Sequence, residues 1–135
     1  MLAGRFAPKK RKWREALAPY NVMNAKFSQI YELYIKKAER KNRSKDEVDT
    51  IIKWLTGYTD KDISLFNKNE ITLGEFLLNI PKLNSNANLI KGLICGIRVE
   101  EIDDPIVKKM RLLDKLIDEL AKGKELSKIL RKEKE

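Results

Sequence analysis

The segment from Asp104 to Leu130 carries the longest helical pattern in the sequence and constrains the fold more than any other stretch. Asp104 suits a helix N-cap, and Pro105 suits the first helical position, where a missing N–H is tolerated. Apolar residues then recur at steps of three and four, which places them on one face of a helix. They are Ile106, Met110, Leu113, Ile117 and Leu120. Gly123 stands where a left-handed C-terminal stop is expected. We therefore expect a helix over 105–122, a short helix after it, and the rest of the chain packed on the longer one.

Four further stretches between residues 27 and 80 show helix signals. Residues 27–41 place apolar and tyrosine side chains at helical spacing, which is typical of a core-facing stripe. Ser44, Thr59 and Thr72 each precede a carboxylate by three residues, which is the pattern of a capping box. Gly57 is expected to end the helix that starts after Ser44.

The stretch 82–99 is harder to interpret. Residues 82–87 are rich in Asn, which favours turns and a helix cap over a ligand site built from amides. For residues 93–99 we favour a helix over a short strand, because no partner strand is evident. The fold class expected for the whole chain is all-α: an orthogonal bundle of about five or six short helices packed on one long C-terminal helix.

Composition sets the compartment and the number of domains. A chain of 135 residues with 42% hydrophobic residues suits one domain with a real core. No apolar run approaches the roughly 18 residues of a membrane span, and no secretory apolar region follows Met1. A single cysteine, Cys95, excludes an internal disulfide and suits a reducing compartment. We expect a cytoplasmic protein that makes no membrane contact.

The charge is concentrated at the N-terminus. The net charge is +9, and residues 1–24 hold six Lys or Arg and one Glu. This predicts a basic extension over 1–19 and a helical domain over 20–135. The candidate nucleic-acid-binding residues are Lys9, Lys10, Arg11, Lys12, Trp13 and Arg14. Such a block can bind phosphates and stack on a base, but it also resembles an import signal, an unpaired tail or sequence upstream of the natural start.

The sequence shows little catalytic chemistry. It contains no histidine, which removes the commonest general base, the Ser-His and Cys-His nucleophile systems, and most zinc sites. We expect no metal, cofactor or catalytic residues. Cys95 lies in an apolar run and is expected to be buried and inert.

One segment, 98–104, could form a ligand site. Arg98, Glu100 and Glu101 are the candidates, since a guanidinium beside carboxylates can grip a phosphate or a carboxylate. A structural role is favoured instead. Arg98 is expected to pair locally with Glu101 or Glu100, and the acidic run suits the start of the following helix.

Several motifs, in order, resemble a bacterial family of small proteins catalogued as domain of unknown function 2200. The matching stretches are FSQIYELY at 27–34, KAERK at 37–41, IKWLTGY at 52–58, ICGIRVEEI at 94–102, DP at 104–105 and LDKLIDELAKG at 113–123. The resemblance covers about residues 20–135 and leaves 1–19 outside. It implies a mainly helical fold, an orthogonal bundle, and a bacterial cytosolic protein. It implies no activity and assigns no site residues.

Helix-packing signals without a catalytic constellation favour a non-enzymatic protein–protein interaction module, whose partner is another protein or a second copy of the chain. Two alternatives stay open. One is a nucleic-acid-associated protein that uses residues 8–14. The other is a small enzyme built on residues 98–104.

Overall fold

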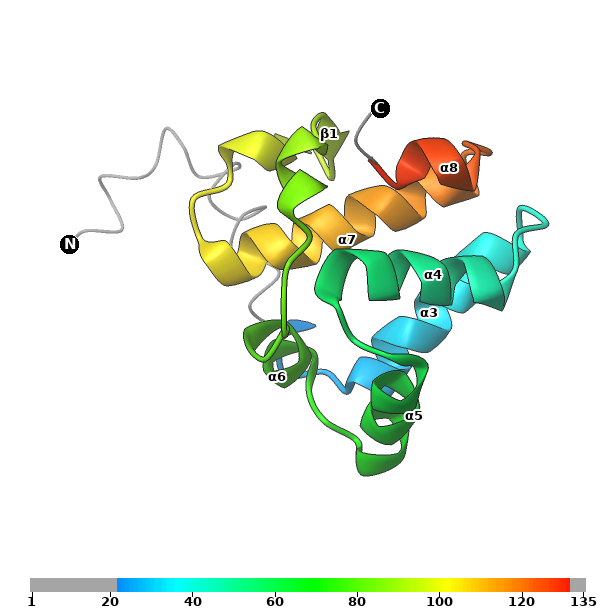
Figure 1. Ribbon diagram of the computed structural model, residues 1–135, viewed down its shortest axis with the longest axis vertical. Helices are drawn as coiled ribbons and strands as arrows, with labels where there is room; N and C mark the ends of the chain where they lie inside the picture. Colours follow the sequence, from blue (N-terminus) through cyan, green and yellow to red (C-terminus); the bar gives the residue numbers. More distant parts are fainter. Residues whose placement is uncertain (1–21, 132–135) are drawn as a thin grey trace.

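The computed structural model describes residues 22–131, which form a mostly helical fold with one small two-stranded sheet (Figure 1). The α-helices are α3 (Phe27–Glu39), α4 (Lys45–Thr56), α5 (Asp60–Asn69), α6 (Leu73–Leu78), α7 (Pro105–Ala121) and α8 (Leu126–Ile129). The 3-10 helices are η2 (Ser85–Leu89) and η3 (Val99–Glu101), and the strands are β1 (Leu93–Ile94) and β2 (Ile97–Arg98). The finer expectation of an orthogonal bundle stays a prediction.

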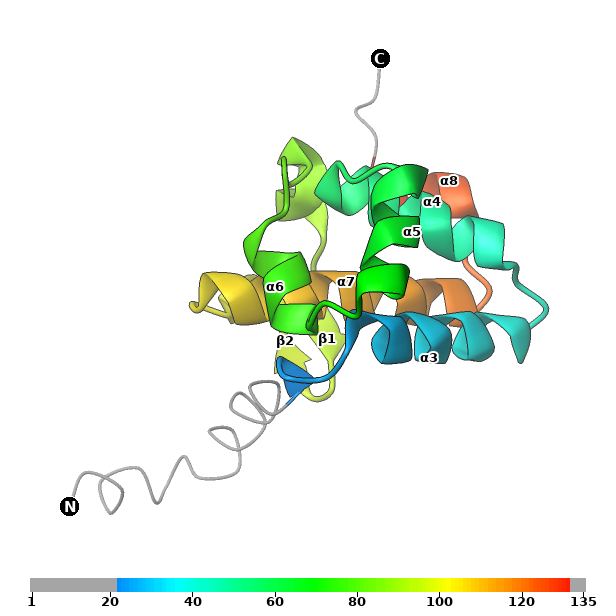
Figure 2. The ribbon, with the colours of Figure 1, turned by 90° about the horizontal axis from the view of Figure 1, so that it is seen from below.

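Helix α7 lies at the centre of the described residues and contacts α3, α4, α6, α8, η3 and β1. In Figure 2, α3 lies along α7, and α4 and α5 lie on the other side of α3. The apolar face of α7 is buried, with Leu113, Leu116 and Leu120 fully inaccessible to solvent. Burial of this face removes more apolar surface from water than any single short helix could, so it organises the core.

The ends of α7 follow the sequence. The Asp104 carboxylate accepts hydrogen bonds from the N–H groups of Ile106, at 2.9 Å, and Val107, at 3.1 Å. Pro105 occupies the first turn, and Gly123 has a φ of 95° just after the helix. The predicted N-cap and the left-handed stop are therefore confirmed.

The three predicted capping boxes are also confirmed. In each, the hydroxyl of Ser44, Thr59 or Thr72 accepts a hydrogen bond from the N–H three residues on, and the carboxylate there accepts one from the cap N–H. Gly57 ends α4 with a φ of 80°. These local hydrogen bonds fix where α4, α5 and α6 begin, before any long-range contact is considered.

The prediction of a helix over 93–99 is wrong. Leu93 pairs with Arg98 and Ile94 with Ile97 in an antiparallel hairpin. The two residues between the strands, Cys95 and Gly96, have φ values of 52° and 80°. Positive φ at both positions is the geometry of the tight turn that matches strand twist. The partner strand was missed because it lies within the same short stretch.

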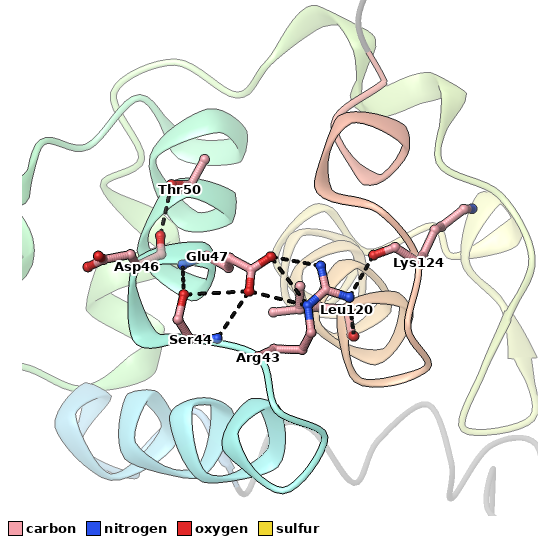
Figure 3. A network of polar contacts seen from close by, with 7 residues as sticks. All are labelled: Arg43, Ser44, Asp46, Glu47, Thr50, Leu120 and Lys124. Carbon is pink, nitrogen blue, oxygen red and sulfur yellow. Dashed lines mark hydrogen bonds and ion pairs between the residues drawn. The ribbon is translucent and has the colours of Figure 1, made fainter.

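Arg43 links the loop before α4 to the C-terminal end of α7 (Figure 3). Its Nη1 donates to the carbonyl oxygens of Leu120, at 3.2 Å, and Lys124, at 2.8 Å. Its Nη2 donates to the Glu47 carboxylate at 2.7 Å, and Ser44 also donates its N–H to Glu47. A single guanidinium thus occupies carbonyls that the end of α7 leaves unpaired and joins them to the capping box of α4.

We expect Leu113→Asp to unfold the domain, because it places an unpaired carboxylate where the native side chain is 0% exposed. Thermal melting followed by circular dichroism measures the effect. The matched control is Leu33→Asp, since Leu33 is 58% exposed, and its cost should stay within about 0.5 kcal/mol. An unchanged melting temperature for Leu113→Asp would contradict the central role of α7.

We expect Arg43→Gln to lower the free energy of unfolding by about 1–3 kcal/mol, because two carbonyls and the Glu47 carboxylate lose a charged donor. Arg43→Lys should recover only part of the loss, since an ammonium lacks the fork geometry. Urea unfolding measures both variants, with Arg40→Gln as the exposed control.

The same contact predicts a pH dependence. Its hydrogen bond with Arg43 holds the pKa of Glu47 below the ordinary value of 4.5. The carboxylate therefore contributes stability that is present above that value and is lost as pH falls through the lowered folded pKa. The difference in unfolding free energy between the wild type and Glu47→Gln should shrink in acid, and a constant difference down to the acid limit would contradict the assignment.

Candidate interaction site

The predicted nucleic-acid residues, Lys9 to Arg14, lie outside the described residues, so that hypothesis and the boundary between 1–19 and 20–135 stay predictions. The other predicted cluster is partly assembled. Arg98 contacts the Glu100 carboxylate at 3.5 Å, as expected, whereas Glu101 lies exposed on η3.

Glu100 has a local structural role. Its Oε1 accepts the Gly92 N–H at 3.0 Å, and the Gly92 carbonyl accepts the Val99 N–H at 2.9 Å. The Gly92 N–H, together with Arg98, holds the pKa of the Glu100 carboxyl below its usual range. These bonds extend the hairpin by one step, so Arg98 and Glu100 close a loop.

The expectation that Cys95 is buried is wrong. Cys95 is exposed, because it occupies the turn between β1 and β2 and its apolar neighbours alternate between the two faces. Its Sγ accepts a hydrogen bond from Nη1 of Arg111 at 3.3 Å. A helix would have shared the burial of the run among all its residues, whereas a hairpin tip leaves its turn residues in solvent.

A small pocket of about 240 Å³ lies beside this contact, between α3 and α7. Arg111 also donates to Asp114 at 3.2 Å, and the Tyr34 hydroxyl donates to the other Asp114 oxygen at 2.6 Å. Burial raises the pKa of Asp114, and the Tyr34 and Arg111 donors oppose that rise. Every charged group of the pocket is thus already committed to a neighbour, which indicates a role in holding α3 on α7.

A more polar pocket of about 500 Å³ lies over α3, α4 and α5. Asp49 accepts a hydrogen bond from the Tyr31 hydroxyl and another from Lys45 at 2.8 Å. Burial and the bond to Asp49 raise the pKa of Tyr31 to about 12. The predicted tyrosine stripe is therefore core, with both hydroxyls used as struts between helices.

The third pocket, a groove of about 370 Å³, lies between η2 and the start of α7, and we call it the η2–α7 groove. It is mostly apolar. Its lining residues are Leu83, Asn84, Ser85, Ala87, Asn88, Pro105, Lys108, Lys109 and Leu112. Asn84 places η2 here: its Oδ1 caps the Asn86 N–H at 2.8 Å, and its amide donates to the Trp54 carbonyl at 3.2 Å. The predicted capping role of the Asn-rich stretch is confirmed.

Four charged side chains near the groove make no ion pair with any of the described residues. Lys108 and Lys109 line it from the first turns of α7, and Glu101 and Asp103 are exposed just before that helix. Beside them, Leu89 of η2 is 49% exposed. An apolar groove with uncommitted charge of both signs is a surface suited to a partner.

Sequence reasoning missed this groove. Its two sides come from segments 83–88 and 105–112, which carry no shared motif. The only local signal was the pair of lysines following Pro105, which the helical pattern explained as a solvated face.

Between residues 22 and 131, no helix combines the length and apolarity needed to cross a bilayer. Within the same range, no three His, Cys, Asp or Glu side chains are grouped so that they could hold a metal ion.

Comparisons with known proteins identify relatives without assigning an activity. Residues 21–131 match the sequence profile of a family described as "Uncharacterized protein conserved in bacteria (DUF2200)". The crystal structure of the uncharacterised protein SP1917 is similar, with 40% sequence identity and a TM-score of 0.78, over 82% of this chain and 90% of that chain. No curated protein matches the chain.

We expect the Cys95 thiol to react with a disulfide reagent such as dithionitrobenzoate in the native protein, because it is exposed at the hairpin turn. The absorbance of the released thiolate measures the reaction, and Cys95→Ser should abolish it. Reaction only after unfolding would contradict the hairpin placement.

Proposed function

The chain belongs to the DUF2200 family of uncharacterised bacterial proteins, and we propose that it is a non-enzymatic protein–protein interaction module whose docking surface is the η2–α7 groove. We further propose a cytoplasmic location, since one exposed thiol suits a reducing compartment.

The observation that carries this proposal is the combination of an apolar lining with two uncommitted lysines. Leu83, Ala87 and Leu112 offer apolar surface, and Lys108 and Lys109 lie beside it. An apolar side chain that entered the groove would gain about 25 cal/mol for each Å² removed from water. Nearby carboxylates on the same partner would meet the two ammonium groups. The partner chemistry is therefore an apolar side chain flanked by carboxylates.

The contrast with the other two pockets supports this choice. In those pockets, Asp114, Arg111, Asp49 and Lys45 are each held by neighbouring side chains, so a ligand would have to displace existing bonds. In the η2–α7 groove, the lysines have no such partner to lose. Binding there leaves the fold unchanged, as docking on a preformed surface generally does.

Anilinonaphthalene sulfonate tests the groove, because it joins an apolar body to one anionic group. We expect the full chain to bind it with enhanced fluorescence, and methyl resonances of Ala87 and Leu112 to shift in NMR spectra. Lys108→Glu combined with Lys109→Glu should weaken binding about tenfold, since two attractive contacts become repulsive.

The matched control is Lys128→Glu, because Lys128 is exposed on α8, away from the groove lining. It should bind the dye as the wild type does. Absence of fluorescence enhancement with the folded full chain, or equal binding by the Lys108 and Lys109 double variant, would contradict the proposal.

A further inference from the structure

Charges of both signs border the same groove. Glu101 and Asp103 lie just before α7 and are exposed, and Lys108 and Lys109 lie within its first turns. All four lack an ion-pair partner among residues 22–131. A partner of one sign would leave half of them unmatched, whereas a partner with the same two-signed pattern would match all of them.

We propose that the occupant of the η2–α7 groove is the same surface of a second copy of this chain, which gives a two-fold symmetric dimer. This inference rests on the proposed function, since it names the partner of that groove. In a two-fold interface, a residue that contacts a second residue is contacted by it in turn. Carboxylates 101 and 103 of each copy therefore face lysines 108 and 109 of the other, and every attractive contact occurs twice.

Leu89 supplies the apolar part of this match. It is 49% exposed, and it follows Asn88, which lines the groove. The surface thus carries an apolar side chain and an apolar groove next to each other. The two-fold axis brings Leu89 of each copy to the groove of the other, so that both gain cover from water.

The charge pattern argues against the other occupants on the page. The chain's own segment 8–14 is strongly basic and would meet Lys108 and Lys109 with like charge. A nucleic-acid backbone would be attracted by those lysines but repelled by Glu101 and Asp103 just beside them. A second copy avoids both conflicts.

The size of the groove sets the expected strength. Stable dimers bury roughly 1,200–2,000 Å² in total, and a groove of about 370 Å³ with a charged rim belongs at the weak end. We expect a dissociation constant on the order of 10 μM at low salt, increasing several-fold at high salt as the ion pairs are screened.

Sedimentation equilibrium of the full chain, from about 1 to about 300 μM, measures the association directly. Two double variants test the charge match. The basic variant combines Glu101→Lys with Asp103→Lys, and the acidic variant combines Lys108→Glu with Lys109→Glu. Each should be monomeric alone, at least tenfold weaker than the wild type, because it carries only one sign around the groove.

An equimolar mixture of the two variants provides the sharpest result. The basic variant then presents lysines at all four positions and the acidic variant carboxylates, so both symmetry-related contacts become attractive again. We expect a mixed dimer of at least wild-type affinity. The quadruple variant, in which all four charges are exchanged, should again form a dimer by itself. Thermal melting of each variant verifies that it is folded.

The control combines Lys124→Glu with Lys128→Glu, which reverses two charges away from the groove, and it should dimerise as the wild type does. A chain that stays monomeric while the dye binds the groove would overturn the dimer and leave the proposed function standing. A monomer that binds no dye would overturn both. Mixed variants that fail to associate, or a dimer that is indifferent to these substitutions, would overturn the dimer through this face.

Discussion

Burial of one face of α7 is the constraint on which the rest of the structure depends. The other helices have between 4 and 13 residues, and isolated helices shorter than roughly 12–15 residues are marginal in water. They persist because α7 gives most of them a common apolar surface that includes Leu113, Leu116 and Leu120. The capping boxes choose where helices start, but the shared contact with α7 makes those helices worth forming.

Polar bonds between helices then select one arrangement of this core. Arg43 joins the start of α4 to the end of α7, Tyr34 joins α3 to α7, and Tyr31 joins α3 to α4. The Tyr58 hydroxyl donates to the Phe76 carbonyl at 2.7 Å and fixes α6 in the same way. Each bond uses a group that would be destabilising if it were buried alone, so a different packing of the same apolar faces would leave it unsatisfied.

The start of α7 shows how one segment meets structural needs and leaves a surface for recognition. Asp104 is used by the helix as a cap, and Glu100 by the hairpin. The local pairing of Arg98 with Glu100 could be predicted, because the two residues are close in sequence. The η2–α7 groove could not, because its two walls are some twenty residues apart and meet only through the bonds of Asn84 to α4.

The sequence by itself determined what depends on neighbouring residues: the caps, the helix stops, the apolar stripe of α7 and the ion pair at residue 98. These are set by backbone geometry and spacing within a few residues. Only the tertiary structure decided that residues 93–98 form a hairpin, that Cys95 is exposed, and that a groove opens beside Pro105. A short apolar run is compatible with helix or strand, and exposure depends on which distant segments cover a residue, so neither can be read from local pattern alone.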